Sequence, residues 1–219
     1  MSRKGLRKES KISRKVGSKS PKPKLIIVCE GENSEPDYII NFAKCAGNGL
    51  VELVLVGGAG VPTSVVRRAK TEKQKQERLA RKSRDPLDKI FEVWAVFDKD
   101  EHPNIPQAFD LAEQNEIKVA FSNPCFEIWP IFHYDTSSAH LDRHAAQRKL
   151  RDLHEPYSEK NGKKVCARTL FSMYSKAKRG AIRLEKEHEA QGTPLSNPHS
   201  NFHNLTDCIL IHGKRRVSK

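Results

Sequence analysis

The sequence has no long apolar run, no paired cysteines and no complete nucleotide-binding signature. No stretch reaches the roughly 18 apolar residues that a membrane-spanning helix needs, so we expect no membrane contact. The basic N-terminus also lacks the apolar core of a secretory signal. Residues 57–60, GGAG, lack the GKS/T ending of a P-loop and the GxGxxG spacing of a dinucleotide fold. A flexible loop is the favoured interpretation, although such a turn between a strand and a helix also suits a phosphate.

Cysteine and histidine do not occur in the spacings of a disulfide framework or a zinc finger. The cysteines are scattered, odd in number and without a CxxC pair, which favours reduced thiols and a cytoplasmic location; they are Cys29, Cys45, Cys125, Cys166 and Cys208. His140 and His144 lie four residues apart, but no cysteine is near them, so we expect no structural zinc there. His199 and His203 have the same spacing and the same interpretation, unless they face an active cleft.

Positive charge is concentrated in three segments. The net charge of the chain is +13, and residues 1–24, 67–84 and 212–219 carry +9, +7 and +4, which leaves −7 for the rest. Basic segments attract polyanions through counterion release and do so regardless of sequence. The partner that this pattern favours is therefore a nucleic acid.

The middle basic segment, 67–84, is expected to form part of a helix. It contains nine basic residues and no aromatic residue, so contact with a nucleic-acid backbone is favoured over base stacking. We take Arg67, Arg68 and Lys70 as candidate contacts. A solvated helix face is an equally good interpretation of the same charges.

Four apolar strands alternate with helical stretches along residues 24–135. This alternation predicts an α/β fold with a parallel four-stranded sheet flanked by helices. Ser34 and Thr63 are expected to cap the first two helices. The predicted strands are 25–30, 51–56, 92–98 and 117–123, and the helices that follow them begin at Ser34 or span 64–82, 106–116 and 124–134.

The domain prediction places a mostly helical part at 136–212, packed on the α/β domain of 24–135. Its candidate helices are 139–153, 167–178, 180–191 and 200–212. The segments 1–23 and 213–219 are predicted to be a disordered basic tail and a short basic tail.

Acidic residues end two of the predicted strands. Glu30 ends the first strand, and Asp98 ends the third and is followed by Asp100. Because function gathers at the carboxyl ends of parallel strands, these carboxylates are expected to converge. Clustered acids repel one another, and a divalent cation removes that cost. The pattern therefore predicts a Mg²⁺ (or Mn²⁺) site for phosphoryl chemistry.

Two segments resemble the motifs of TOPRIM domains, namely VCEGENSEPDY at 28–38 and VFDKDEH at 96–102. The segments SNPCFEIWPIFH at 122–133 and NPHSNFHNL at 197–205 further resemble RloB-family proteins. The resemblance covers roughly residues 24–210. It implies a metal-dependent nuclease or a nucleic-acid-binding role, as in the nuclease-like TOPRIM proteins of prokaryotic restriction loci and antiphage defence.

The same resemblance assigns roles to single residues. Glu30 resembles the acid/base glutamate, and Asp98 and Asp100 resemble the metal-binding pair. Glu127 is a further candidate ligand, or an acid favoured by a helix dipole. Glu35 has the same two interpretations.

Lys99 and His102 are candidate phosphate contacts, and Asn123 is expected to cap a helix. The main alternative is a non-catalytic nucleic-acid-binding or regulatory subunit, with a response-regulator-like phosphoacceptor as a weaker one. The sequence leaves open DNA against RNA, including tRNA, as well as a partner protein from a defence operon and self-association.

Overall fold

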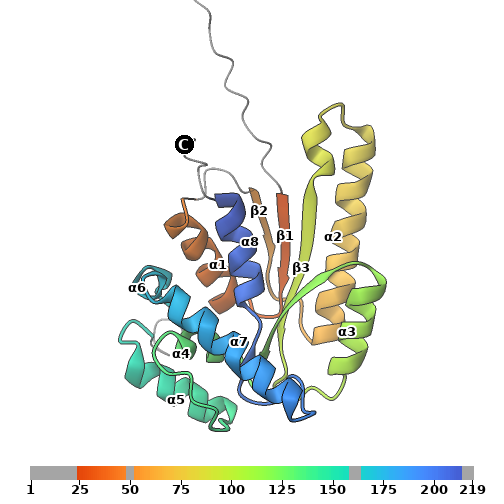
Figure 1. The fold of residues 1–219 in the computed structure, drawn as a ribbon. Coiled ribbons are helices and arrows are strands. Elements are labelled where there is room, and N and C mark those ends of the chain that lie inside the picture. Colours follow the sequence, from red (N-terminus) through yellow and green to blue (C-terminus); the bar gives the residue numbers. More distant parts are fainter. Residues whose placement is uncertain (1–23, 48–51, 158–163, 214–219) are drawn as a thin grey trace, which may run out of the picture.

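A single five-stranded sheet organises the protein (Figure 1). The computed structural model describes residues 24–47, 52–157 and 164–213. The strand order is β2-β1-β3-β4-β5, and the first four are mutually parallel, as predicted. The strands are β1 (Lys24–Cys29), β2 (Glu52–Val56), β3 (Phe91–Asp98), β4 (Lys118–Asn123) and β5 (His199–Ser200). The predicted tails at 1–23 and 213–219 lie outside the described residues, except that Gly213 belongs to the last helix, α8 (His203–Gly213).

Helices cover both faces of the sheet (Figure 1). None of the helices in the described part of the chain is both long and apolar enough to cross a bilayer. The longer helices are α1 (Ser34–Cys45), α2 (Pro62–Lys82), α3 (Ile105–Gln114), α5 (Arg143–Leu153), α7 (Tyr174–Ala190) and α8 (His203–Gly213). The shorter ones are α4 (Ile128–Phe132), α6 (Ala167–Phe171) and the 3₁₀ turn η1 (Pro86–Lys89).

Strand alternation divides the core into two apolar clusters. Ile26 and Val28 point toward α2 and α3, whereas Leu25 and Ile27 point toward α1 and the C-terminal helices. Both faces of β1 are therefore buried, which is why its sequence reads as a continuous apolar run. Trp94 and Trp129 are core residues, as expected from their apolar surroundings.

The first two helices begin differently from the prediction. Asn33 precedes α1, and Ser34 is its first residue rather than its cap. α2 begins at Pro62, after Val61 and before Thr63. Proline suits the first helical position because its missing N–H would have no partner there, so no capping side chain is required.

The break between α6 and α7 falls at residues 172–173 rather than at 179. Gly180 lies inside α7, where a side chain would collide with Thr136. The glycine thus allows α7 to approach residue 136 closely, and it does not interrupt the helix.

The fifth strand was not predicted, and it joins the C-terminal part to the sheet. β5 pairs antiparallel with the end of β4, where the hydroxyls of Ser122 and Ser200 lie 3.1 Å apart. The Asn201 side-chain oxygen accepts the backbone N–H of Phe121 at 2.6 Å. The predicted helix at 200–212 consequently begins only at His203.

Candidate metal and nucleic-acid site

The candidate site lies where the strand order reverses. The chain passes from β1 to β2 on one side and returns to β3 on the other, so β1 and β3 are neighbours in the middle of the sheet. Crevices at the carboxyl ends of such strands are the usual ligand sites of open α/β sheets. Glu30 follows β1 and Asp98 ends β3, which places both at this crevice.

Glu30 is connected directly to the residues that follow β3. Its Oε2 accepts the backbone N–H of Asp98 at 3.1 Å, and its Oε1 lies 3.2 Å from His102 Nε2. Burial raises the pKa of Glu30, although the Asp98 N–H and His102 act against this shift. The structure therefore brings Glu30 to the end of β3 and next to His102, a contact that the sequence analysis did not predict.

Glu35 in the first turn of α1 also points into the crevice. It is buried, and its carboxylate lies against Gly31 so closely that a Cβ on Gly31 would collide with it. Burial raises the pKa of Glu35, and the nearby Glu127 and Glu30 raise it further.

Asp98 lies in the middle of these acids. Its Oδ2 accepts the backbone N–H of Phe126 at 2.9 Å. Burial raises its pKa well above the ordinary value, and repulsion from Glu35, Glu127 and Glu30 adds to this. We call Glu30, Glu35, Asp98 and Glu127 the carboxylate cluster.

Glu127 enters the carboxylate cluster from the loop before α4. It is buried and its Oε1 accepts the hydroxyl hydrogen of Tyr157 at 2.7 Å. No capping hydrogen bond from its side chain to α4 is present. Its contacts therefore differ from those of a simple helix-capping acid.

Asp100 makes its contacts outside the carboxylate cluster. Its φ of 39° is in the left-handed region, so the segment is not extended as we expected. The backbone N–H of Asp100 donates to the Pro124 carbonyl at 2.9 Å. The Asp100 carboxylate forms an ion pair with Arg143 of α5.

A cleft of about 740 Å³ lies beside the carboxylate cluster. Asp100 and Arg143 lie in its lining, together with exposed Lys99 and partly buried His102. The other lining residues are Glu101, Asn123, Pro124, His140, Asp142, His144, Gln147 and Asn197. The cleft therefore combines basic and imidazole groups with three carboxylates, of which Asp100 is paired with Arg143.

The candidate contacts on α2 do not line this cleft. Arg67, Arg68 and Lys70 are exposed, and Arg68 pairs with Glu72 at 3.0 Å. The first turn of α2 lies toward the edge of the sheet where β1 and β3 end (Figure 1). These residues are thus accessible but separate from the carboxylate cluster.

The glycine-rich loop supports the turn after β1. The backbone N–H of Gly58 donates to the Gly31 carbonyl at 3.1 Å, and that of Ala59 donates to the Cys29 carbonyl at 3.2 Å. Gly58 has a φ of +69°, and a Cβ there would contact Glu32. The backbone N–H groups of Gly58 and Ala59, which could otherwise donate to a phosphate, are therefore bonded to carbonyls on either side of Glu30.

Three further sequence expectations concern His199, His203 and Asn123. His199 and His203 are buried and do not line the cleft. Burial lowers the pKa of His199 to about 4, with smaller effects from His188 and His203. Asn123 does not cap a helix, because its amide donates to the Leu195 carbonyl at 2.7 Å.

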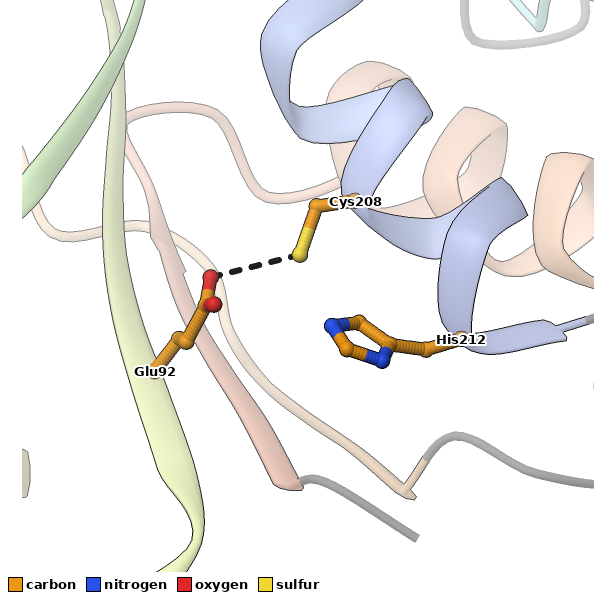
Figure 2. Close-up of side chains that lie close together, drawn as sticks. All are labelled: Glu92, Cys208 and His212. Carbon is orange, nitrogen blue, oxygen red and sulfur yellow. Dashed lines mark hydrogen bonds between the residues drawn. The ribbon is translucent and has the colours of Figure 1, made fainter.

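The carboxylate cluster suits a hard cation in its chemistry. All of its donor atoms are carboxylate oxygens, which Mg²⁺ prefers, and their mutual repulsion would be relieved by a divalent ion. The carboxylate oxygens of the carboxylate cluster are more widely spaced than the ligand atoms of a closed metal site, since no three of them lie within 4.8 Å of one another. Among the described residues, the only group of three or more histidine, cysteine or acidic ligands within 4.8 Å of one another is Glu92, Cys208 and His212, shown in Figure 2.

Sequence reasoning missed several residues of these sites. Arg143 and Tyr157 contact site acids from distant parts of the chain, and no local pattern indicated them. Cys208 and His212 lie four residues apart on α8, a spacing that could have been noticed.

Comparison with known proteins yields one match. A family model described as RloB-like protein matches residues 25–209. No curated protein and no solved structure matches the chain.

Proposed function

Because the chain belongs to the RloB-like protein family, and because two buried and two partly buried carboxylates gather where β1 and β3 end, we propose that it is a metal-dependent nuclease. Its substrate would be a phosphodiester of DNA or structured RNA such as tRNA. The observation that carries the proposal is the clustering of Asp98 with Glu30, Glu35 and Glu127: burial raises the pKa of Asp98, and repulsion from the other three acids raises it further. The proposal includes a role in antiphage defence, which the resemblance to TOPRIM proteins of restriction loci supports, and a cytoplasmic location, which the unpaired cysteines favour.

The carboxylate cluster would hold one or more Mg²⁺ or Mn²⁺ ions. Glu35 and Glu127 offer buried oxygens and Asp98 a partly buried one, and Asp100 would join them if its ion pair with Arg143 opened. Bound there, the metal would supply an activated water and stabilise the negative charge that develops on the phosphate.

Glu30 is suited to proton transfer. One of its oxygens is fixed by the Asp98 backbone N–H, and the other faces His102. Burial favours the protonated form of Glu30, which brings its pKa closer to neutrality. In the proposed reaction Glu30 exchanges a proton with the reacting oxygen, and His102 orients the carboxyl group.

The adjacent cleft would hold the substrate backbone. Lys99 and Arg143 lie in its lining and offer donors to phosphate oxygens. Arg143 would then leave its ion pair with Asp100 and pair with a phosphate of the substrate, so the Asp100 carboxylate would become available. The exposed basic residues of α2 would add contacts that do not depend on sequence.

A second candidate is a non-catalytic nucleic-acid-binding subunit. The ion pair between Asp100 and Arg143 favours it, because this pair neutralises one of the two expected metal-binding aspartates. The basic surfaces would then bind nucleic acid without cleaving it.

Cleavage of mixed DNA and RNA substrates with Mg²⁺ or Mn²⁺ separates these functions. Asp98→Asn is expected to lower cleavage by at least about 100-fold, because metal stabilisation of the transition state contributes several kcal/mol. Asp110→Asn, which changes an exposed acid on α3, is the matched control and should keep full activity. Equal cleavage by both variants would show a contaminating nuclease. Binding without cleavage by any of the proteins, under all metals, would favour the second candidate.

A further inference from the structure

A separate group of metal-ligand side chains lies at the amino end of β3, opposite the carboxyl ends of the strands that carry the carboxylate cluster. Cys208 and His212 project from the same face of α8, since residues four apart on a helix are neighbours. Glu92 lies near the start of β3, far along the strand from Asp98. Figure 2 shows the three side chains directed toward one another, with Cys208 Sγ 3.2 Å from Glu92 Oε2.

We propose that Glu92, Cys208 and His212 bind one Zn²⁺ ion that ties α8 to the amino end of β3. Their ligand atoms all lie within 4.8 Å of one another. In a tetrahedral zinc site with bonds of 2.0–2.3 Å, ligand atoms are roughly 3.3–3.7 Å apart. Glu92 and His212 are only partly buried, so their side chains have room to close the remaining distance.

The donor set distinguishes this site from the carboxylate cluster. Sulfur, imidazole nitrogen and carboxylate oxygen together suit Zn²⁺, whereas Mg²⁺ requires oxygen ligands. Three protein ligands leave a fourth position, and a cleft of about 510 Å³ adjoins them. That position would be filled by water.

The surroundings of Glu92 also support this arrangement. Trp94 Nε1 donates to Glu92 Oε2 at 3.2 Å. Hydrogen bonds of this kind, from residues that do not touch the metal, orient the ligands of metal sites. Lys118 Nζ lies 2.9 Å from the same oxygen and is half exposed. Its ammonium group competes with a cation for Glu92, and it is free to swing into solvent when the ion binds.

Cobalt substitution tests the proposal in the full-length protein. The metal-free wild type should take up one Co²⁺ with a thiolate-to-cobalt charge-transfer band, and Zn²⁺ should displace it. Cys208→Ser should abolish the band, whereas Cys45→Ser, at the end of α1, should keep it. A band that persists in Cys208→Ser would overturn the proposal, because the thiolate would then belong to another site.

Zinc affinity and thermal unfolding provide a second readout. His212→Ala should weaken zinc binding by more than the roughly 10–100-fold that loss of an outer-sphere partner causes. It should also remove the zinc-dependent rise of the melting temperature seen in the wild type. Asp98→Asn should change neither the zinc affinity nor the zinc-dependent rise of the melting temperature, since Asp98 lies at the other end of β3. Equal zinc affinity in wild type and His212→Ala would refute the site, whether or not the chain cleaves nucleic acid.

Discussion

The carboxylate of Glu30 accepts the backbone N–H of Asp98 at 3.1 Å, and this bond joins the ends of two neighbouring parallel strands. The same carboxylate contacts His102 at 3.2 Å. Glu30 therefore holds the Asp98 backbone in place and also offers a group for proton transfer. These two roles are separable by substitution.

Glu30→Gln should separate the structural role from the chemical one. Glutamine keeps an oxygen that accepts the Asp98 N–H, but it cannot take up or release a proton. We expect cleavage to fall by roughly 10²–10⁴-fold, the usual contribution of general acid–base catalysis. Circular dichroism melting should show nearly unchanged stability for Glu30→Gln and a loss for Glu30→Ala. Full activity in the glutamine variant would refute the proton-transfer role.

Asp98→Asn should stabilise the metal-free protein at neutral pH. The folded-state pKa of Asp98 is raised, so its stabilising, protonated form is fully present below the unfolded value of 3.8 and is lost as the pH rises through the folded pKa. Asparagine stays neutral and removes this loss. The melting temperature should rise by a few degrees, since 1 kcal/mol corresponds to about 2–4 °C for a chain of this size.

Magnesium titration provides the control for this effect. Mg²⁺ should stabilise the wild type more than Asp98→Asn, because the ion relieves the repulsion that the substitution has already removed. A variant that is less stable than the wild type without metal would show that the Phe126 N–H bond outweighs the repulsion.

Buried histidines should cause a loss of stability in acid. Burial lowers the pKa of His133 from 6.5 to about 4, so its contribution is present above pH 6.5 and is lost as the pH falls toward 4. At 1.36 kcal/mol per pKa unit, the loss amounts to about 3 kcal/mol. His133→Asn should reduce the difference in unfolding free energy between pH 7 and pH 4, measured in urea. Exposed His140→Asn should leave that difference unchanged.

Arg143→Ala should increase the affinity for Mn²⁺. Removing the guanidinium frees the Asp100 carboxylate, which then becomes available to the metal. The ion pair is partly exposed, so the fold should lose at most about 1 kcal/mol. Paramagnetic titration should show several-fold tighter binding than in Arg148→Ala, a control on the same helix. Unchanged binding would place Asp100 outside the metal site.

The two strand-end acids were predictable because apolar strands are visible in the sequence. The runs that end at Glu30 and Asp98 are continuous and bounded by turn residues, so both the strands and the convergence of their ends followed from general rules of parallel sheets. The neighbouring positions of β1 and β3 confirm that arrangement. The metal and the reaction stay predictions.

Other contacts depend on chain segments that meet only in the folded molecule. β5 contains two residues and pairs through Ser200 with Ser122, which leaves no periodic pattern to detect. Asp100 lies in a loop and Arg143 in α5, and neither their ion pair nor the left-handed backbone at Asp100 has a local sequence signal. The predicted break at residue 179 is absent because α7 continues through this position, where Gly180 leaves room for the Thr136 side chain.

Gly31→Ala should impair the carboxylate cluster without touching any acid. The new Cβ would collide with the Glu35 carboxylate, which is buried and has little room to move. We expect lower stability, by about 1–3 kcal/mol as is typical of overpacking, together with reduced cleavage. In a Glu35→Ala background the same substitution should cost much less, because the colliding group is gone. A double-mutant cycle measures this coupling, and additive losses would mean that Gly31 acts through the backbone of the turn instead.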